Sequence, residues 1–285
     1  FRGRSDGLRT VQRLQARCGL CWVLRVEFPE CDCLKRRKSF PKEDRNMSNY
    51  EEFMCAFSEI EKYLRRQAKS NDKYDTFYRL IDKAKAISPA VRQYETDLRE
   101  LGDLRNAITH ERTDGHPIAE PYPATVSLIK SIARILKNPP KARSFQKEVV
   151  KVLIHDKLEK VIKEIKEHSY SQIPVYDGEE YRGILTTNAI ARFISDISEE
   201  GIAMFGNTEV GEVLEHAEES EVAAFVGSDD DLFKVLEKFT EHSKHRKKLE
   251  AIIITSNADP NKKPIGIITA WDIPEILEKI DPVKC

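Results

Sequence analysis

No stretch of this sequence is long and apolar enough to cross a membrane. Its apolar runs, such as residues 251–255, are far shorter than the roughly 20 residues that a membrane-spanning helix needs. The first residues also lack the charged region, apolar stretch and small-residue cleavage site of a secretory signal. We therefore expect no membrane partner and a cytoplasmic location.

Neither sign of charge dominates the chain, whose formal net charge is −1. The distribution is uneven: residues 1–46 carry 12 basic and 6 acidic side chains, and residues 47–285 carry 35 basic and 42 acidic ones. A mildly acidic body disfavours broad, sequence-independent binding to nucleic acid, because such binding needs clustered cations. A local basic groove would remain compatible with this sum.

Residues 1–46 lack any sustained helical or strand periodicity, and the segment does not begin with Met. Lys42, Glu43 and Asp44 can be encoded as AAG-GAG-GAY, which contains the purine-rich ribosome-binding sequence AGGAGG just upstream of the Met47 codon. We therefore expect residues 1–46 to be translated leader, disordered or irregular, and Met47 to be the natural start of a bacterial protein.

Cysteine is scarce in the body of the chain, where only Cys55 and Cys285 occur, so no disulfide framework is expected and a reducing compartment fits. The other four cysteines form a CxxC and a CxC pattern: Cys18, Cys21, Cys31 and Cys33. Four thiolates could hold zinc, which is the alternative interpretation of the first segment. The short second spacing argues against it, and we expect no metal.

Residues 47–140 are predicted to be a helical domain. Apolar side chains recur at spacings of three and four in three stretches: Phe53, Phe57, Ile60, Leu64; Phe77, Leu80, Ile81, Ala84; and Tyr94, Leu98, Leu101, Leu104, Ile108. A fourth helix is predicted over about residues 124–136, ending before Pro139 and Pro140. Four helices with mostly short loops predict an antiparallel four-helix bundle.

After residue 140, short β-branched runs alternate with single helices, which predicts a second domain of α/β type over residues 141–285 and an α+β chain overall. Residues 171–177 lead to 181–186 and then to a helix, and residues 249–255 lead to 264–269 and another helix. This is an internal repeat, with its first copy at about residues 144–200 and its second at about 208–282.

In each copy a strand ends in Gly-apolar-apolar-Thr directly before a helix, which places a hydroxyl and backbone N–H groups where phosphate or ribose oxygens are favoured. The copies resemble CBS (cystathionine beta-synthase) domains, whose signature is an apolar-Pro-Val strand followed by Gly-x-x-Thr-x-x-Asp. The resemblance covers nearly all of residues 144–280. It implies clefts for AMP, ADP, ATP, S-adenosylmethionine or a related ligand, with strand backbone groups holding adenine and the Thr and Asp holding ribose.

The second copy has the whole motif, in Gly266, Thr269 and Asp272. We therefore expect one good ligand site, centred on this copy. The strand residues that the resemblance places near the ligand are Ile252 and Ile253 in the second copy, and Ser171, Ile173 and Pro174 in the first. The basic run at residues 244–248 could meet a polyphosphate, although such runs more often form a solvated face.

The first copy has Gly183 and Thr186, but Ala189 stands where the ribose-binding Asp is expected. Asn188, one residue earlier, is at best a partial substitute. A carboxylate can accept two hydrogen bonds from ribose hydroxyls and alanine can accept none, so this copy is not expected to form a full site. In the simpler alternative, Thr186 and Thr269 only cap helices and side chains fill the clefts.

The third predicted helix of the helical domain contains the pattern R-N-x-x-x-H, formed by Arg105, Asn106 and His110. Asn106 and His110 are four residues apart and lie on one helix face, with Asp103 one turn earlier. A four-helix bundle with this motif resembles the HEPN superfamily (higher eukaryotes and prokaryotes nucleotide-binding), many of whose active members are metal-independent endoribonucleases. The resemblance implies a homodimer that shares the motif, and an RNA substrate.

The chemistry of such a site would suit these residues. His110 could move a proton to or from a ribose oxygen, Arg105 could stabilise phosphate charge, and Asn106 could orient either group. Alternatively, Asn106 and His110 only cap the helix end. Three functions therefore remain open: a regulator in which the CBS pair controls a helical effector domain, a ligand-gated endoribonuclease, and a non-catalytic dimeric interaction scaffold.

Overall fold

The computed structural model describes residues 47–283 except 73, 111, 114–115, 118, 200–205 and 246. The predictions made for residues 1–46 lie outside these described residues. The chain divides into two compact units, one made of residues 1–139 with 278–285 and the other of residues 140–277. The last residues of the chain, 278–285, group with the helical unit.

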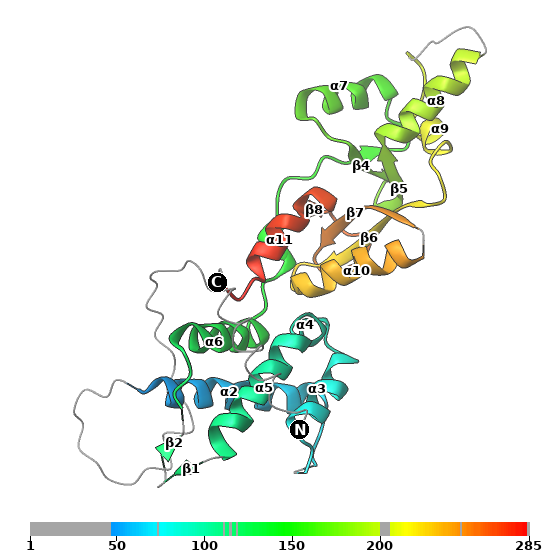
Figure 1. The fold of residues 1–285 in the computed structure, drawn as a ribbon. Helices are drawn as coiled ribbons and strands as arrows, with labels where there is room; N and C mark the ends of the chain where they lie inside the picture. The colour runs from blue at the N-terminus through cyan, green and yellow to red at the C-terminus, as the bar shows by residue number, and fades with distance from the viewer. Residues whose placement is uncertain are drawn as a thin grey trace. The chain divides into compact units, whose positions relative to one another are not determined.

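The first unit is helical where the apolar periodicity predicts it (Figure 1). Its elements are α2 (Asn49–Gln67), α3 (Phe77–Lys85), α4 (Pro89–Gln93), α5 (Glu95–His110) and α6 (Pro123–Lys137). A two-residue hairpin, β1 (Arg112–Thr113) and β2 (His116–Pro117), lies in the long loop before α6 and was not expected. The four-helix bundle remains a prediction, because the helices alone do not establish that architecture.

Local chemistry explains where these helices begin. Ser48 and Glu51 form a reciprocal capping box at the start of α2, and Thr76 caps α3. Ser88 caps α4, with Pro89 at its first position. Tyr94 leaves the helical conformation and separates α4 from α5.

The apolar stripes of these helices form the core of the unit. The side chains that are fully buried or nearly so include Phe53, Ile60, Leu64, Leu80, Ile81, Leu98, Leu101, Ile129, Ile132 and Leu136. The core also takes in the end of the chain: Ile280 is buried, and its carbonyl accepts a hydrogen bond from the Tyr94 hydroxyl at 2.5 Å. No described helix combines the length and apolar character needed to span a bilayer.

Cys55 on α2 is disulfide-bonded in the structure, a bond that the sequence analysis did not anticipate.

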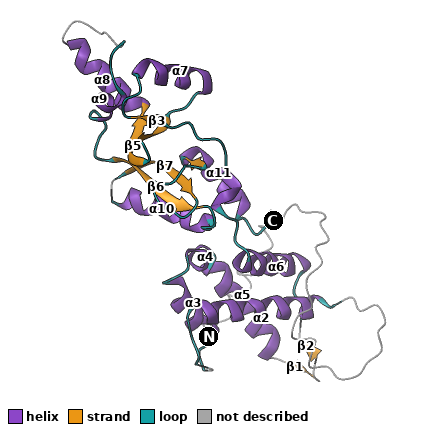
Figure 2. Cartoon of the chain, turned by 180° about the vertical axis from the view of Figure 1, so that it is seen from behind, coloured by secondary structure: helices purple, strands orange, loops and turns teal. Residues whose placement is uncertain are grey.

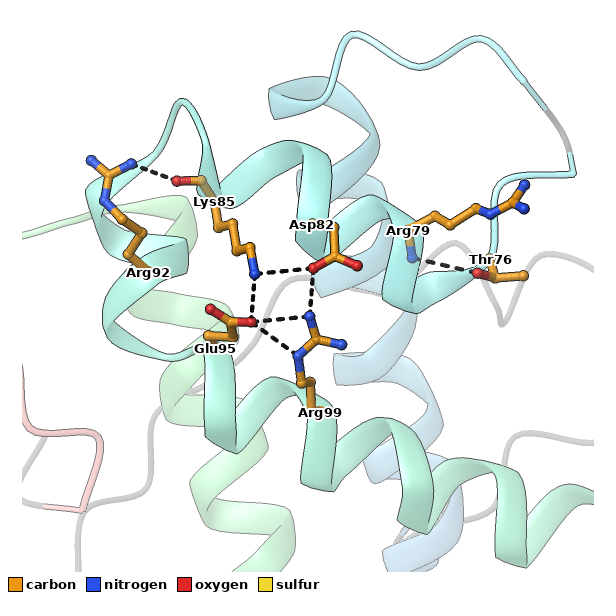
Figure 3. A network of polar contacts seen from close by, with 7 residues as sticks. All are labelled: Thr76, Arg79, Asp82, Lys85, Arg92, Glu95 and Arg99. Carbon is orange, nitrogen blue, oxygen red and sulfur yellow. Dashed lines mark hydrogen bonds and ion pairs between the residues drawn. The ribbon is translucent and has the colours of Figure 1, made fainter.

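A closed ring of four charged side chains joins α3 to α5 (Figure 3). Lys85 lies 3.1 Å from Asp82 and 2.9 Å from Glu95, and Arg99 lies 2.5 Å from Asp82 and 3.0 Å from Glu95. Each cation therefore contacts both carboxylates. The ring is solvent-accessible. Its ion pairs therefore fix the register of the two helices more than they add to the packing of the core.

The second unit contains two sheets of the same topology (Figures 1 and 2). In the first, β3 (Val152–Leu153) pairs in parallel with β4 (Gln172–Asp177), which pairs antiparallel with β5 (Glu180–Thr186). In the second, β6 (Glu221–Gly227), β7 (Lys248–Thr255) and β8 (Gly266–Ile268) repeat this order and these directions. The internal repeat predicted from the sequence is thus confirmed.

Helices complete each repeat. In the first copy, α7 (Leu158–His168) connects the parallel strands and α8 (Thr187–Glu199) follows β5. In the second copy, α9 (Val210–Leu214) precedes the sheet, α10 (Leu232–Lys244) connects its parallel strands, and a turn η3 (Ala270–Asp272) leads into α11 (Ile273–Lys279). A further turn, η2 (Ala142–Phe145), opens the unit and contacts β8.

Candidate functional site

A cavity of about 430 Å³ lies within the second unit, where three segments meet. Residues 147–150 come from the stretch before the first sheet, residues 169–173 lead into β4, and the third segment follows β8: Ile267, Thr269 and Trp271. The cavity therefore combines one strand entrance of the first copy with the motif of the second. Its size is in the range of small-molecule sites, roughly 300–1,000 Å³.

The motif threonine and aspartate of the second copy contact each other. Asp272 Oδ2 accepts hydrogen bonds from the backbone N–H of Thr269 at 2.6 Å and from its hydroxyl at 3.1 Å. Both residues are half-buried, and Thr269 lines the cavity. Asp272 Oδ1 makes no hydrogen bond within the described part of the chain, so the carboxylate keeps acceptor capacity beside the cavity.

Position 266 needs glycine because another backbone segment approaches it closely. A Cβ at this position would lie 2.7 Å from the Phe145 carbonyl oxygen and 2.8 Å from Ile254 Cδ1. The segment after Phe145 also pairs with the strand at Gly266. Gln146 forms an isolated antiparallel β-bridge with Gly266, and the Lys147 N–H donates to the Ile265 carbonyl at 3.1 Å. The absent side chain thus lets this segment lie against β8 and continue as one wall of the cavity.

That wall presents unpaired backbone groups. The N–H groups of Glu148, Val149 and Val150 donate to no acceptor in the described part of the chain. Both valines are half-buried. Backbone N–H donors beside a partly apolar cavity are suited to the polar edge of a planar ring, because each N–H is an obligatory hydrogen-bonding group.

The other residues expected at the clefts divide into two groups. Ser171 and Ile173 line the cavity, and the Ser171 hydroxyl donates to Gln172 Oε1 at 3.0 Å. Pro174 is buried within β4, while Ile252 and Ile253 are completely buried in β7 and do not line the cavity. The sequence comparison of the two copies could not find Tyr170, Trp271 or residues 147–150, because none belongs to the repeated motif.

At the corresponding place in the first copy, the motif threonine contacts other side chains of the protein. The Thr186 hydroxyl donates to Glu221 Oε2 at 3.2 Å and accepts from the Ala189 N–H at 3.0 Å, and Thr186 is buried. Arg192 pairs with the same Glu221 oxygen at 2.6 Å. Glu221 therefore occupies the acceptor role that the expected Asp would have played, and Asn188 is exposed.

The basic run at residues 244–248 contributes no described residue to the cavity lining. Lys248 is instead 2.6 Å from Glu250 Oε1, and its hydrogen bond to that carboxylate raises the lysine pKa. The cation that does line the cavity is Lys147.

In the helical unit, the R-N-x-x-x-H pattern lies at the end of α5. Arg105 Nη1 donates to Asn106 Oδ1 at 3.1 Å, and Asn106 Nδ2 donates to the Tyr78 hydroxyl at 3.4 Å. Tyr78 in turn donates to Asp103 Oδ1 at 2.5 Å; burial, followed by this bond, raises its pKa to about 12. His110 is the last residue of α5, and its side chain lies outside the described part of the structure.

Comparison with known families identifies the second unit. The family model of the CBS domain matches residues 142–196 and 210–279, the two stretches that form the repeated sheets. This part of the chain is a tandem pair of CBS domains, as the motif resemblance implied. No curated protein sequence matches the chain.

Solved structures with the same pattern of elements include three examples. The CBS domain of a bacterial CNNM/CorC family Mg²⁺ transporter in complex with ATP is 18% identical, over 55% of this chain and 97% of that one, with a TM-score of 0.36. A hemolysin-like CBS protein of Oenococcus oeni PSU is 17% identical, over 49% and 91%, with a TM-score of 0.35. Hypoxic Response Protein I with two zinc ions is 20% identical, over 47% and 97%, with a TM-score of 0.35.

Proposed function

We propose that the CBS pair binds an adenosine-containing ligand in the cavity and thereby controls the helical domain. The observation that carries the proposal is the Thr269–Asp272 pair, a hydroxyl and a carboxylate held together at the edge of a ligand-sized cavity. This arrangement suits the two adjacent hydroxyls of a ribose, because the Asp272 oxygens can accept from both.

The remaining chemistry of the lining supports a nucleotide. Val149, Val150, Ile173 and Ile267 offer apolar contacts for a base, and the unpaired N–H groups of residues 148–150 can meet its polar edge. Lys147 supplies a cation for phosphate. In this proposal, AMP, ADP, ATP and S-adenosylmethionine share the adenosine that fills the cavity, and they differ in what extends beyond it.

Regulation would require the ligand to prefer one arrangement of the protein. The covalent order of the chain supports such a link. Asp272 ends the turn that leads directly into α11, and the residues that end α11 and follow it, Glu278–Cys285, group with the helical unit. A ligand that tightens the turn at Thr269 therefore acts on the start of a seven-residue helix whose far end belongs to the helical unit.

A thermal-shift titration of the full chain with AMP, ADP, ATP and S-adenosylmethionine tests ligand binding. We expect at least one of them to raise the melting temperature of the second unit, because a ligand that binds only the folded state stabilises it. Thr269→Val should lose the shift, whereas Thr240→Val, which changes an exposed threonine on α10, should keep it. The absence of a shift with every ligand would contradict the proposal.

An endoribonuclease activity of the helical unit is a second proposal. It is favoured by the bonded pair of Arg105 and Asn106, both half-buried at the end of α5 and joined to Tyr78 and Asp103. Such a cluster could hold a phosphate and orient an attacking hydroxyl. In the HEPN-type mechanism His110 would be the proton-transfer group and the site would be shared by a homodimer.

Incubation of the full chain with structured and single-stranded RNA tests this second proposal. The native chain and His155→Ala, which changes an exposed histidine of the other unit, should cleave alike, and His110→Ala should not. Cleavage that survives in His110→Ala would point to a contaminating nuclease. If neither ligand binding nor cleavage is found, a dimeric interaction scaffold is the function that remains.

A further inference from the structure

Trp271 has the most exposed large apolar side chain among the described residues, with 89% of its surface accessible. It lies between Thr269 and Asp272 in the turn η3, and it lines the cavity. Its indole offers an open, flat apolar face to a ligand that enters the cavity.

The backbone that carries Trp271 is fixed on both sides. The reciprocal Thr269–Asp272 capping box closes the turn around it, with the Asp272 N–H also donating to the Thr269 carbonyl at 3.0 Å. The indole is therefore presented from a rigid turn and can change only its side-chain torsions. A rigid aromatic platform loses little conformational entropy when a flat partner binds.

A second aromatic ring lines the same cavity from the first copy. Tyr170 follows Ser169, whose left-handed backbone conformation ends α7, and its ring stacks on that of His168 at 5.2 Å and 24° between planes. Tyr170 is half-buried, and its position is supported by this stacking. The cavity thus has one supported aromatic ring and one exposed indole, contributed by different copies.

We propose that Trp271, with Tyr170, forms the base-stacking wall of the ligand site and makes the site selective for ligands with a purine-like base. The inference rests on the proposed nucleotide function and adds to it the residues that recognise the base. A ribose held by Thr269 and Asp272 carries its base on the adjacent C1′ carbon, so the base lies within reach of the residue between them. The indole face is neutral and apolar, which suits a base and not a phosphate.

Tryptophan fluorescence of the full chain tests the inference, because Trp22 is the only other tryptophan and the Trp271→Phe variant gives its contribution. AMP or ATP should change the emission of the native chain and not that of Trp271→Phe. Trp271→Ala should bind the nucleotide at least about fivefold more weakly, since base–aromatic stacking contributes about 1–3 kcal/mol, and Trp271→Phe should lose less.

Two further binding measurements test the contribution of the base alone. Ribose 5-phosphate, which has no base, should bind the native chain and Trp271→Ala equally. Tyr74→Ala, which removes an equally exposed aromatic that does not line the cavity, should bind nucleotide as the native chain does. The melting temperature of Trp271→Ala without ligand should match the native value, because the indole makes little contact in the folded chain.

The outcomes separate this inference from the proposed function. Equal nucleotide affinity of the native chain and Trp271→Ala would overturn the stacking role and leave nucleotide binding intact. A Trp271→Ala chain that binds nucleotide normally but loses self-association would overturn it too, and would assign the indole to an interface between copies. A native chain that binds no nucleotide at all would remove both proposals together.

Discussion

At the scale of single residues, the motif glycine acts on the backbone and not on the ligand. Gly266 faces the Phe145 carbonyl, and the segment packed against it continues directly into the cavity wall at residues 147–150. The motif therefore has two roles in one short stretch. Its glycine lets the segment that forms the cavity wall pack closely, and its Thr269–Asp272 pair lies beside that wall.

Replacing Gly266 by alanine should therefore damage the site without touching the ligand. The added Cβ would meet backbone at 2.7 Å, and overpacking of this kind costs about 1–3 kcal/mol. We expect Gly266→Ala to lower the free energy of unfolding, measured by denaturant titration, and to weaken ligand binding even where the chain is folded. Gly206→Ala, at a position where a Cβ meets nothing within 4 Å, is the matched control. Unchanged binding in a folded Gly266→Ala would contradict the role given to the wall.

The first copy shows at the same scale why a motif comparison cannot locate every partner. The loss of the aspartate at Ala189 was readable from the sequence, and it correctly indicated an incomplete motif. What replaces it was not readable, because Glu221 is 35 residues from Thr186 and reaches it only through strand β6. The buried Glu221 carboxylate contacts Arg192 and the Thr186 hydroxyl through the same oxygen.

At the scale of elements, the charged ring between α3 and α5 makes the helical unit sensitive to acid. Hydrogen bonds from Lys85 lower the pKa of Asp82 and of Glu95 below their usual values of 3.8 and 4.5, and Arg99 adds to both shifts. Because the folded-state pKa values are lowered, the ring stabilises the fold above the unfolded pKa values, and this contribution is lost as the pH falls through the folded ones.

Lys85→Met should therefore reduce the acid sensitivity of the helical unit. We expect the native chain to lose more unfolding free energy than Lys85→Met when the pH is lowered from about 6 to about 3, and the difference to shrink in high salt. Lys163→Met, which breaks an exposed ion pair on α7, controls for the loss of one charge. Parallel pH profiles of the native and Lys85→Met chains would show that the ring does not contribute.

The elements themselves were largely predictable, and their assembly was not. Apolar spacing located α2, α3, α5 and α6, and the duplicated strand pattern located both sheets. The short helix α4, which ends before Tyr94, was not predicted as a separate element. The family resemblance placed Ile252 and Ile253 near the ligand; β7 is the central strand of its sheet, and both side chains are fully buried there.

At the scale of the whole molecule, the CBS pair is asymmetric although its two sheets match. One place of the pair is a cavity lined by residues of both copies, and at the equivalent place in the first copy Glu221 contacts Thr186 and Arg192. A duplicated fold with one complete motif is thus expected to bind one ligand per chain. A single site would make the response of the helical unit depend on one binding event.

Calorimetric titration of the full chain with the adenosine ligand found by thermal shift tests this central claim most directly. We predict one site per chain, with Asp272→Ala weakening binding at least about tenfold, because a group that bonds the ligand through a charged acceptor contributes about 1.5–3 kcal/mol, and with Asn188→Ala leaving it unchanged. Two equivalent sites per chain, or binding that depends on Asn188 and not on Asp272, would contradict the account.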